Sequence, residues 1–142
     1  MEKIQGKSLQ REAVTTDTVA ATTAFADLDA EVKLAIQCAS DKKAFDMVAL
    51  DLREIASFTE FFIIVSGANQ RQVQAIADEI NERLKKDLRS KAVRVEGYRT
   101  GEWVLLDYGD FVVHVFDKDA REMYDLTRLW SDAKRVLIPA NI

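Results

Sequence analysis

Residues 61–66 read Phe61-Phe62-Ile63-Ile64-Val65-Ser66, an apolar run without a charged residue. A strand that faces water on one side alternates apolar and polar residues, whereas a strand covered on both faces is apolar throughout. The run therefore predicts a strand in the middle of a sheet, and the rest of the domain is expected to form around it.

The residues after this strand predict a helix and then another strand. Asn69 is a favoured helix N-cap, and Gln72 three residues later completes the pattern of a capping box. Apolar residues then recur at helical spacing as far as Leu88. A strand is predicted at residues 92–96, and the piece 61–96 is long enough for a crossover connection.

A hairpin is predicted further along, with strands at residues 102–107 and 111–116. The short Tyr108-Gly109-Asp110 link between them suits an antiparallel pair. Aromatic and β-branched residues fill both strands, and charges are few. One face should pack on the helices, which leaves the other as a candidate interface. A hairpin buried on both faces is equally compatible with the pattern.

The flanking segments predict a helix at residues 27–40, a strand at 47–52 and a last helix that opens at Asp119. The last helix is expected to turn four residues toward the core, namely Met123, Leu126, Leu129 and Trp130. The predicted fold class is α/β, one domain with a mixed five-stranded sheet flanked by helices. Its order is helix, strand, strand, helix, strand, strand, strand, helix.

The lack of a sustained period at the chain ends predicts two tails. Residues 1–24 are expected to form a flexible N-terminal tail and residues 136–142 a C-terminal tail. The domain itself is expected to span residues 25–135.

Charge and cysteine content exclude several protein classes. The chain has 20 Lys and Arg against 24 Asp and Glu, a net charge of −4. Phosphate contacts call for a basic excess, so we expect little or no direct nucleic-acid binding and a basic partner instead. A single cysteine, Cys38, allows no internal disulfide, and no apolar run approaches the roughly 20 residues that span a bilayer. We expect a cytoplasmic protein without membrane contact.

Residues suited to catalysis are sparse. His114 is the only histidine, and strand alternation places it on the face of Val112 and Phe116, as a structural or a binding-surface residue. A zinc site needs more His and Cys, and the glycines form no phosphate-binding loop. We therefore expect no catalytic residue, no metal site and no cofactor.

One enzyme class deserves comparison. A strand that ends in Ser66-Gly67 before a helix resembles nucleotidyltransferases, which use an Asp-x-Asp pair after that turn to hold magnesium. Here Ala68-Asn69-Gln70 follows instead, and Asp51 and Asp107 are isolated acids on separate strands. The pattern therefore disfavours this chemistry.

The segments described above resemble, in their order and spacing, those of the ribosomal silencing factor family, also called Iojap. The resemblance covers about residues 28–131. The most specific part is the hairpin with its Trp, Asp, Tyr, Gly, Asp and His, followed by Arg-x-x-Tyr and Leu-Trp. The family often has Thr-Asp-Tyr where this chain has Thr59-Glu60-Phe61. The segments that carry the resemblance are Ala49-Leu50-Asp51-Leu52, Thr59 to Gly67, Gln72 to Ile80, Glu96-Gly97, Trp103 to Phe116, Arg121 to Leu126 and Leu129-Trp130.

The resemblance implies a nucleotidyltransferase-like core without catalytic carboxylates, and a role that is not enzymatic. Members of the family bind the large-subunit ribosomal protein L-fourteen. They thereby block association of the ribosomal subunits sterically and repress translation under nutrient limitation. A nucleotidyltransferase-like enzyme and a homodimeric scaffold that pairs through the same hairpin remain the alternatives. The partner-binding residues that the resemblance implies are Trp103, Leu105, Asp107 and Tyr108, with Asp110, His114, Glu60, Arg121 and Tyr124 beside them.

Overall fold

The apolar run forms strand β3, Phe61–Gly67, and each of its residues is buried. The computed structural model describes residues 22–142, and β3 lies there in the middle of a seven-stranded sheet with the order β1-β7-β2-β3-β6-β5-β4. It pairs antiparallel with β2, Phe45–Asp51, and parallel with β6, Phe111–Asp117. The predicted central position of this strand is confirmed.

Helix α3, Gln70–Leu88, begins where the capping residues predict. The Asn69 side chain accepts a hydrogen bond from the backbone N–H of Gln72 at 2.9 Å. The Gln72 side chain reaches back to the N–H of Ala68 at 2.6 Å. Two N–H groups that the helix cannot satisfy internally are therefore paired, which fixes the start of the helix.

The predicted hairpin is also confirmed. Strand β5, Trp103–Asp107, runs antiparallel to β6, and β4, Arg94–Glu96, pairs with β5 at the edge of the sheet. Gly109 has φ +87°, a conformation that side chains with a Cβ rarely adopt. This glycine is therefore what allows the short link to turn.

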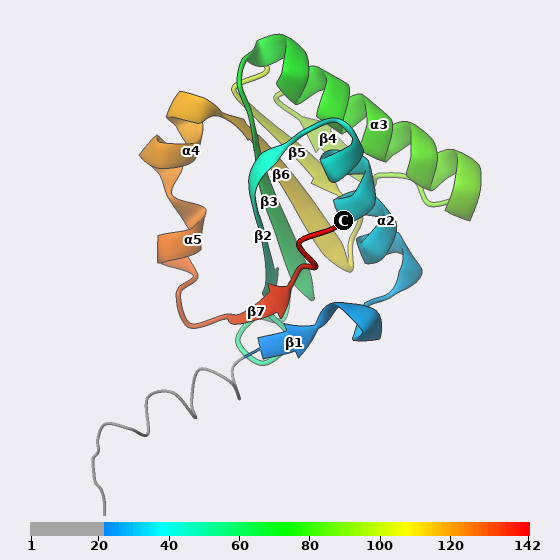
Figure 1. Cartoon of the computed structure of the whole chain (residues 1–142), viewed down its shortest axis with the longest axis vertical. Coiled ribbons are helices and arrows are strands. Elements are labelled where there is room, and N and C mark those ends of the chain that lie inside the picture. Colours follow the sequence, from blue (N-terminus) through cyan, green and yellow to red (C-terminus); the bar gives the residue numbers. More distant parts are fainter. Residues whose placement is uncertain (1–21) are drawn as a thin grey trace, which may run out of the picture.

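The helices cover the sheet from both sides, as Figure 1 shows. Helix α2, Ala30–Asp41, and α3 lie on one face, while α4, Lys118–Tyr124, and α5, Leu126–Leu129, lie on the other. Because neighbouring strand residues point to opposite faces, two apolar clusters form. The larger lies under α2 and α3 and includes Ile63, and the smaller lies under α4 and α5 and includes Ile64. None of the helices within residues 22–142 is long and apolar enough to cross a membrane.

The prediction of a five-stranded sheet was wrong. Strands β1, Thr22–Ala24, and β7, Lys134–Leu137, extend the sheet beyond β2. Strands of three and four residues are too short to show alternation, and β1 pairs with a segment far away in the sequence. Both strands reach into segments that were predicted as tails. Residues 1–21 of the predicted N-terminal tail lie outside the described residues.

The helix ends differ from the prediction in two places. A short 3-10 helix at Phe25–Asp27 precedes α2, so α2 starts later than expected. The last helical segment starts at Lys118, because the Asp117 side chain caps it by accepting a hydrogen bond from the N–H of Ala120 at 2.8 Å. Asp125, with φ +41°, then divides it into two short helices.

This division changes which residues the last helical segment buries. Leu126 is buried and Trp130 half-buried, as predicted. Met123 and Leu129 are 76% and 72% exposed, so their predicted burial was wrong. A continuous helical stripe would have placed all four on one face, but the break at Asp125 interrupts the period.

Candidate functional site

The face of the hairpin that points away from α2 and α3 is the candidate site. Val104 and Leu106 are buried on the side of α2 and α3, so their neighbours on β5 point to the other side. Across the two strands, Trp103 lies opposite Phe116, Leu105 opposite His114, and Asp107 opposite Val112. We call these six residues the hairpin face.

Trp103 organises one end of the hairpin face. Its ring lies 4.9 Å from the ring of Phe116 and 4.6 Å from that of Tyr124, measured between centroids. Its indole N–H donates to Nδ1 of His114 at 3.1 Å. Trp103 is nevertheless only half-buried and Tyr124 is exposed, so apolar ring surface remains accessible.

His114 is buried in the hairpin face, with 4% of its surface exposed. Burial lowers the pKa of His114 to about 4, so the ring is neutral at physiological pH. Its ring meets that of Phe62 edge-on at 4.5 Å. The prediction that His114 shares a face with Val112 and Phe116 is confirmed, because His114 and both of these residues point away from α2 and α3.

A pocket of about 150 Å³ opens between His114 and the edge of the sheet. Its walls are mainly apolar, and the guanidinium of Arg94 and the carboxylate of Asp107 pair at 3.5 Å on its lining. The residues that line it are Phe58, Phe62, Arg94, Leu105, Asp107, Val112 and His114.

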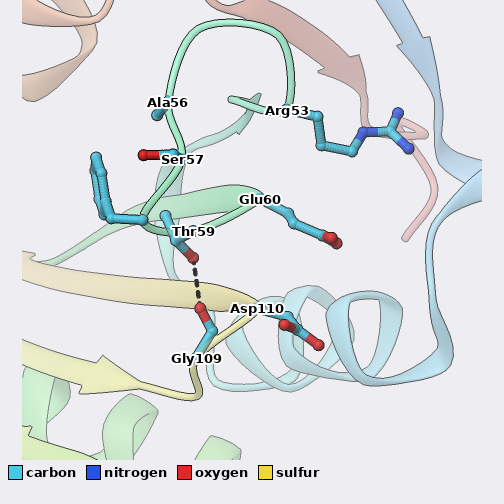
Figure 2. Close-up of a pocket in the computed structure, with 8 residues that line it drawn as sticks. Arg53, Ala56, Ser57, Thr59, Glu60, Gly109 and Asp110 are labelled. Carbon is cyan, nitrogen blue, oxygen red and sulfur yellow. Dashed lines mark hydrogen bonds between the residues drawn. The ribbon is translucent and has the colours of Figure 1, made fainter.

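A second pocket, of about 370 Å³, lies where the loop before β3 meets the hairpin turn (Figure 2). The buried hydroxyl of Thr59 donates to the carbonyl of Gly109 at 2.9 Å, and the N–H of Glu60 donates to the carbonyl of Asp110 at 2.8 Å. The side chains of Glu60 and Asp110 extend toward the same side in Figure 2, together with Arg53. The fold therefore brings together two predicted acidic site residues that are far apart in sequence.

Tyr108 differs from the other predicted contact residues. Its ring stacks on Phe111 at 4.8 Å and packs against the cluster beneath α2 and α3, which is the opposite side of the sheet from Trp103. Its hydroxyl is buried without a hydrogen-bond partner in residues 22–142. Burial raises the pKa of Tyr108 to about 12. Tyr108 therefore packs on the α2 and α3 side of the sheet and does not line the hairpin face.

Arg121 and Tyr124 come from α4 and have different surroundings. Arg121 is half-buried and donates to the hydroxyl of Ser66 at 2.7 Å, and burial lowers the pKa of its guanidinium. This bond holds α4 against the end of β3. Tyr124, 49% exposed, thereby lies against Trp103 and extends the hairpin face.

Sequence reasoning missed Phe58. It lies in the polar segment between the strands predicted at residues 47–52 and 61–66, where no site residue but Glu60 was predicted. Phe58 is 60% exposed, and its ring lies 6.0 Å from that of Phe62 and 5.9 Å from that of Trp130. An aromatic residue inside a short polar loop was the available signal, because such a residue must find a surface to pack on. Phe58 lines both pockets and therefore lies between the hairpin face and the pocket that Glu60 and Asp110 line.

The acidic residues considered for catalysis, Asp51 and Asp107, do not lie together at one site. Asp51 lies on β2 and Asp107 on β5, with β3 and β6 between them. Although burial alone raises it, hydrogen bonds from Arg53 and Thr23 hold the pKa of Asp51 at about 2, so this carboxylate serves a structural ion pair. Burial raises the pKa of the Cys38 thiol to about 11. Across the part of the chain that the structure describes, no three His, Cys, Asp or Glu residues are placed to hold a metal ion.

Comparison with known proteins gives one family. The family model described as "Ribosomal silencing factor during starvation" matches residues 26–141. The ribosomal silencing factor RsfS of Halalkalibacterium halodurans is 44% identical over 105 residues, which are 74% of this chain and 89% of that protein. RsfS of Bacillus subtilis is 42% identical over 102 residues, 72% of this chain and 86% of that protein.

A solved structure agrees with the sequence matches. The crystal structure of a Chromobacterium violaceum protein has a TM-score of 0.69 to this fold at 36% identity, and the likeness covers 78% of this chain and 88% of that chain. The family model matches most of the chain and the relatives are 44% and 42% identical, and this chain therefore belongs to the ribosomal silencing factor family.

Proposed function

We propose that this protein binds the large ribosomal subunit through ribosomal protein L-fourteen and sterically prevents the small subunit from joining, which represses translation when nutrients are limiting. Membership of the ribosomal silencing factor family supports a regulatory role on the ribosome. Such a role needs no covalent step, only occupation of the volume that the other subunit must enter. The place of action would be the cytoplasm.

The observation that carries this proposal is the incomplete cover of the hairpin face. Segments α4 and α5 pack over the part of this face that includes Phe116, while Leu105 and Trp103 stay half-buried and Tyr124 and Phe58 stay exposed. Aromatic residues with accessible ring surface are the residue types that dominate binding energy in protein interfaces.

The charges around the hairpin face suit a basic partner. Asp107 lies on the pocket beside Leu105, and Glu60 and Asp110 border the loop pocket next to it. Ribosomal proteins are generally basic, so acidic groups at the rim would steer the encounter and fix its orientation. Tyr108 and Arg121 would act indirectly, by holding the hairpin and α4 in place.

The nucleotidyltransferase-like core without catalytic carboxylates remains part of this proposal. The absence of a catalytic carboxylate pair is compatible with the positions of Asp51 and Asp107, because two strands, β3 and β6, lie between the strands that carry them. Self-association through the hairpin face would compete with ribosome binding, because both would use the same apolar surface. We therefore expect a homodimer, where one forms, to be inactive in silencing.

Subunit joining measured by light scattering tests the proposal. Protein added to purified large subunits should suppress formation of the joined ribosome, and Trp103→Ala should need roughly 30-fold more protein for the same effect, as a central aromatic contact would. Tyr98→Ala is the control, since Tyr98 is an exposed aromatic residue whose hydroxyl donates to Asp78 on α3, away from the hairpin face. Unchanged joining at saturating wild-type protein would show that the proposed function is wrong.

A further inference from the structure

His114 carries a hydrogen-bond donor that the fold leaves unused. The indole N–H of Trp103 can only donate, so Nδ1 of His114 must accept with its lone pair. In a neutral imidazole the proton then resides on Nε2. Nε2 is buried and has no hydrogen-bond partner among residues 22–142. Trp103 therefore fixes His114 as a donor whose N–H has no acceptor.

Such a group is unusual in a folded protein. Buried polar atoms nearly always have partners, because a buried N–H without an acceptor loses its hydrogen bond to water and forms none in its place. The penalty corresponds to roughly a tenfold to hundredfold shift in an equilibrium constant. A partner that supplied an acceptor at this place would recover that factor on binding.

The pocket beside His114 has room for one side chain. At about 150 Å³ it matches the size of an apolar cavity that takes up a benzene ring. Leu105, Phe62 and Val112 give it apolar walls, and Phe58 closes one side. Phe58 is 60% exposed and is the wall most easily displaced, because exposed side chains change rotamer readily.

We propose that the bound partner protein inserts one neutral side chain with a carbonyl or hydroxyl oxygen into this pocket, and that Nε2–H of His114 donates to that oxygen. The inference rests on the proposed function and names the chemistry recognised at that site. An amide side chain such as glutamine, or the hydroxyl of threonine or tyrosine, has the required apolar body and acceptor.

The charges at the pocket exclude an ionised occupant. Arg94 and Asp107 are already paired with each other, and Arg94 also bonds to Glu96 at 3.1 Å. A carboxylate would meet the like charge of Asp107, and an ammonium or guanidinium group would offer His114 no acceptor. A neutral acceptor satisfies the donor without a desolvated charge.

Nitrogen-15 NMR of histidine-labelled protein tests the inference directly. His114 is the only histidine, so its signals need no assignment. The free protein should show the proton on Nε2, and titration with purified ribosomal protein L-fourteen should move the Nε2–H proton resonance downfield as the new hydrogen bond forms. A proton on Nδ1, or a resonance that stays in place while binding is complete, would overturn the inference.

The variant His114→Phe gives an independent measurement, because phenylalanine keeps a ring and removes the donor. Its affinity for purified large subunits should fall about tenfold while the fold is retained. Wild-type affinity in His114→Phe would overturn the inference and leave the proposed function intact. Absence of binding by the wild-type protein would instead refute the proposed function, together with the inference that rests on it.

Discussion

Replacement of Asp51 by asparagine separates a structural carboxylate from a functional one. The Asp51 side chain is 4% exposed and pairs with the Arg53 guanidinium at 2.7 Å. It also accepts a hydrogen bond from the Thr23 hydroxyl at 2.7 Å, which ties β2 to the segment that forms β1. Asparagine keeps the size of the side chain but removes the charge that these donors stabilise.

The size of the effect follows from the pKa of Asp51, which the fold lowers from 3.8 to about 2. A lowered pKa means that the ionised form stabilises the folded state above the unfolded-state pKa, and that this stability is lost as pH falls toward the folded-state pKa. We expect Asp51→Asn to lower the free energy of unfolding by about 2 kcal/mol at pH 7. At pH 3 the difference should shrink to about 1 kcal/mol.

Urea denaturation at pH 7 and pH 3 measures both values. Asp46→Asn is a suitable control, because Asp46 is an exposed carboxylate on the same strand and asparagine tolerates its φ of +49°. Two results would refute the reasoning: a loss below about 0.5 kcal/mol at pH 7, or a loss that is the same at both pH values. At temperatures where Asp51→Asn is folded, its affinity for large subunits should fall less than that of Trp103→Ala, because β3 and β6 lie between Asp51 and β5 in the sheet.

Two further predictions concern the hairpin turn. Asp110→Lys should weaken capture of purified ribosomal protein L-fourteen about tenfold at low salt and less at high salt, because it reverses a rim charge next to Glu60; capture independent of this change would place the interface elsewhere. Tyr108→Phe should leave the free energy of unfolding unchanged or raise it by up to about 1 kcal/mol, since it removes a buried hydroxyl that has no partner in the described structure. A loss of more than about 1 kcal/mol in urea denaturation would show that this hydroxyl is hydrogen-bonded in solution.

The site was only partly predictable from sequence, as Tyr108 and His114 show. Alternation along β6 placed His114 correctly with Val112 and Phe116, because a regular strand repeats every two residues. Continued alternation from Val104 and Leu106 also places Tyr108 on the side of α2 and α3, where its ring lies, but Tyr108 was assigned to the interface from the family resemblance. Local periodicity gives the face on which a side chain lies, whereas which part of that face stays uncovered depends on how α4 and α5 pack.

The sequence by itself determined the central strand, the hairpin and the start of α3, because hydrophobic period, turn chemistry and capping depend on residues close together in the chain. The family followed from the resemblance of the chain's segments to those of known members. Only the tertiary structure decided that Thr59 binds Gly109, that Arg121 anchors α4 to Ser66, and that β1 pairs with β7 at the edge of the sheet. It also decided that Nδ1 of His114 accepts from Trp103, while Nε2 is buried without an acceptor among residues 22–142. These contacts join residues that are distant in sequence, and their existence depends on how whole elements pack, which no local pattern encodes.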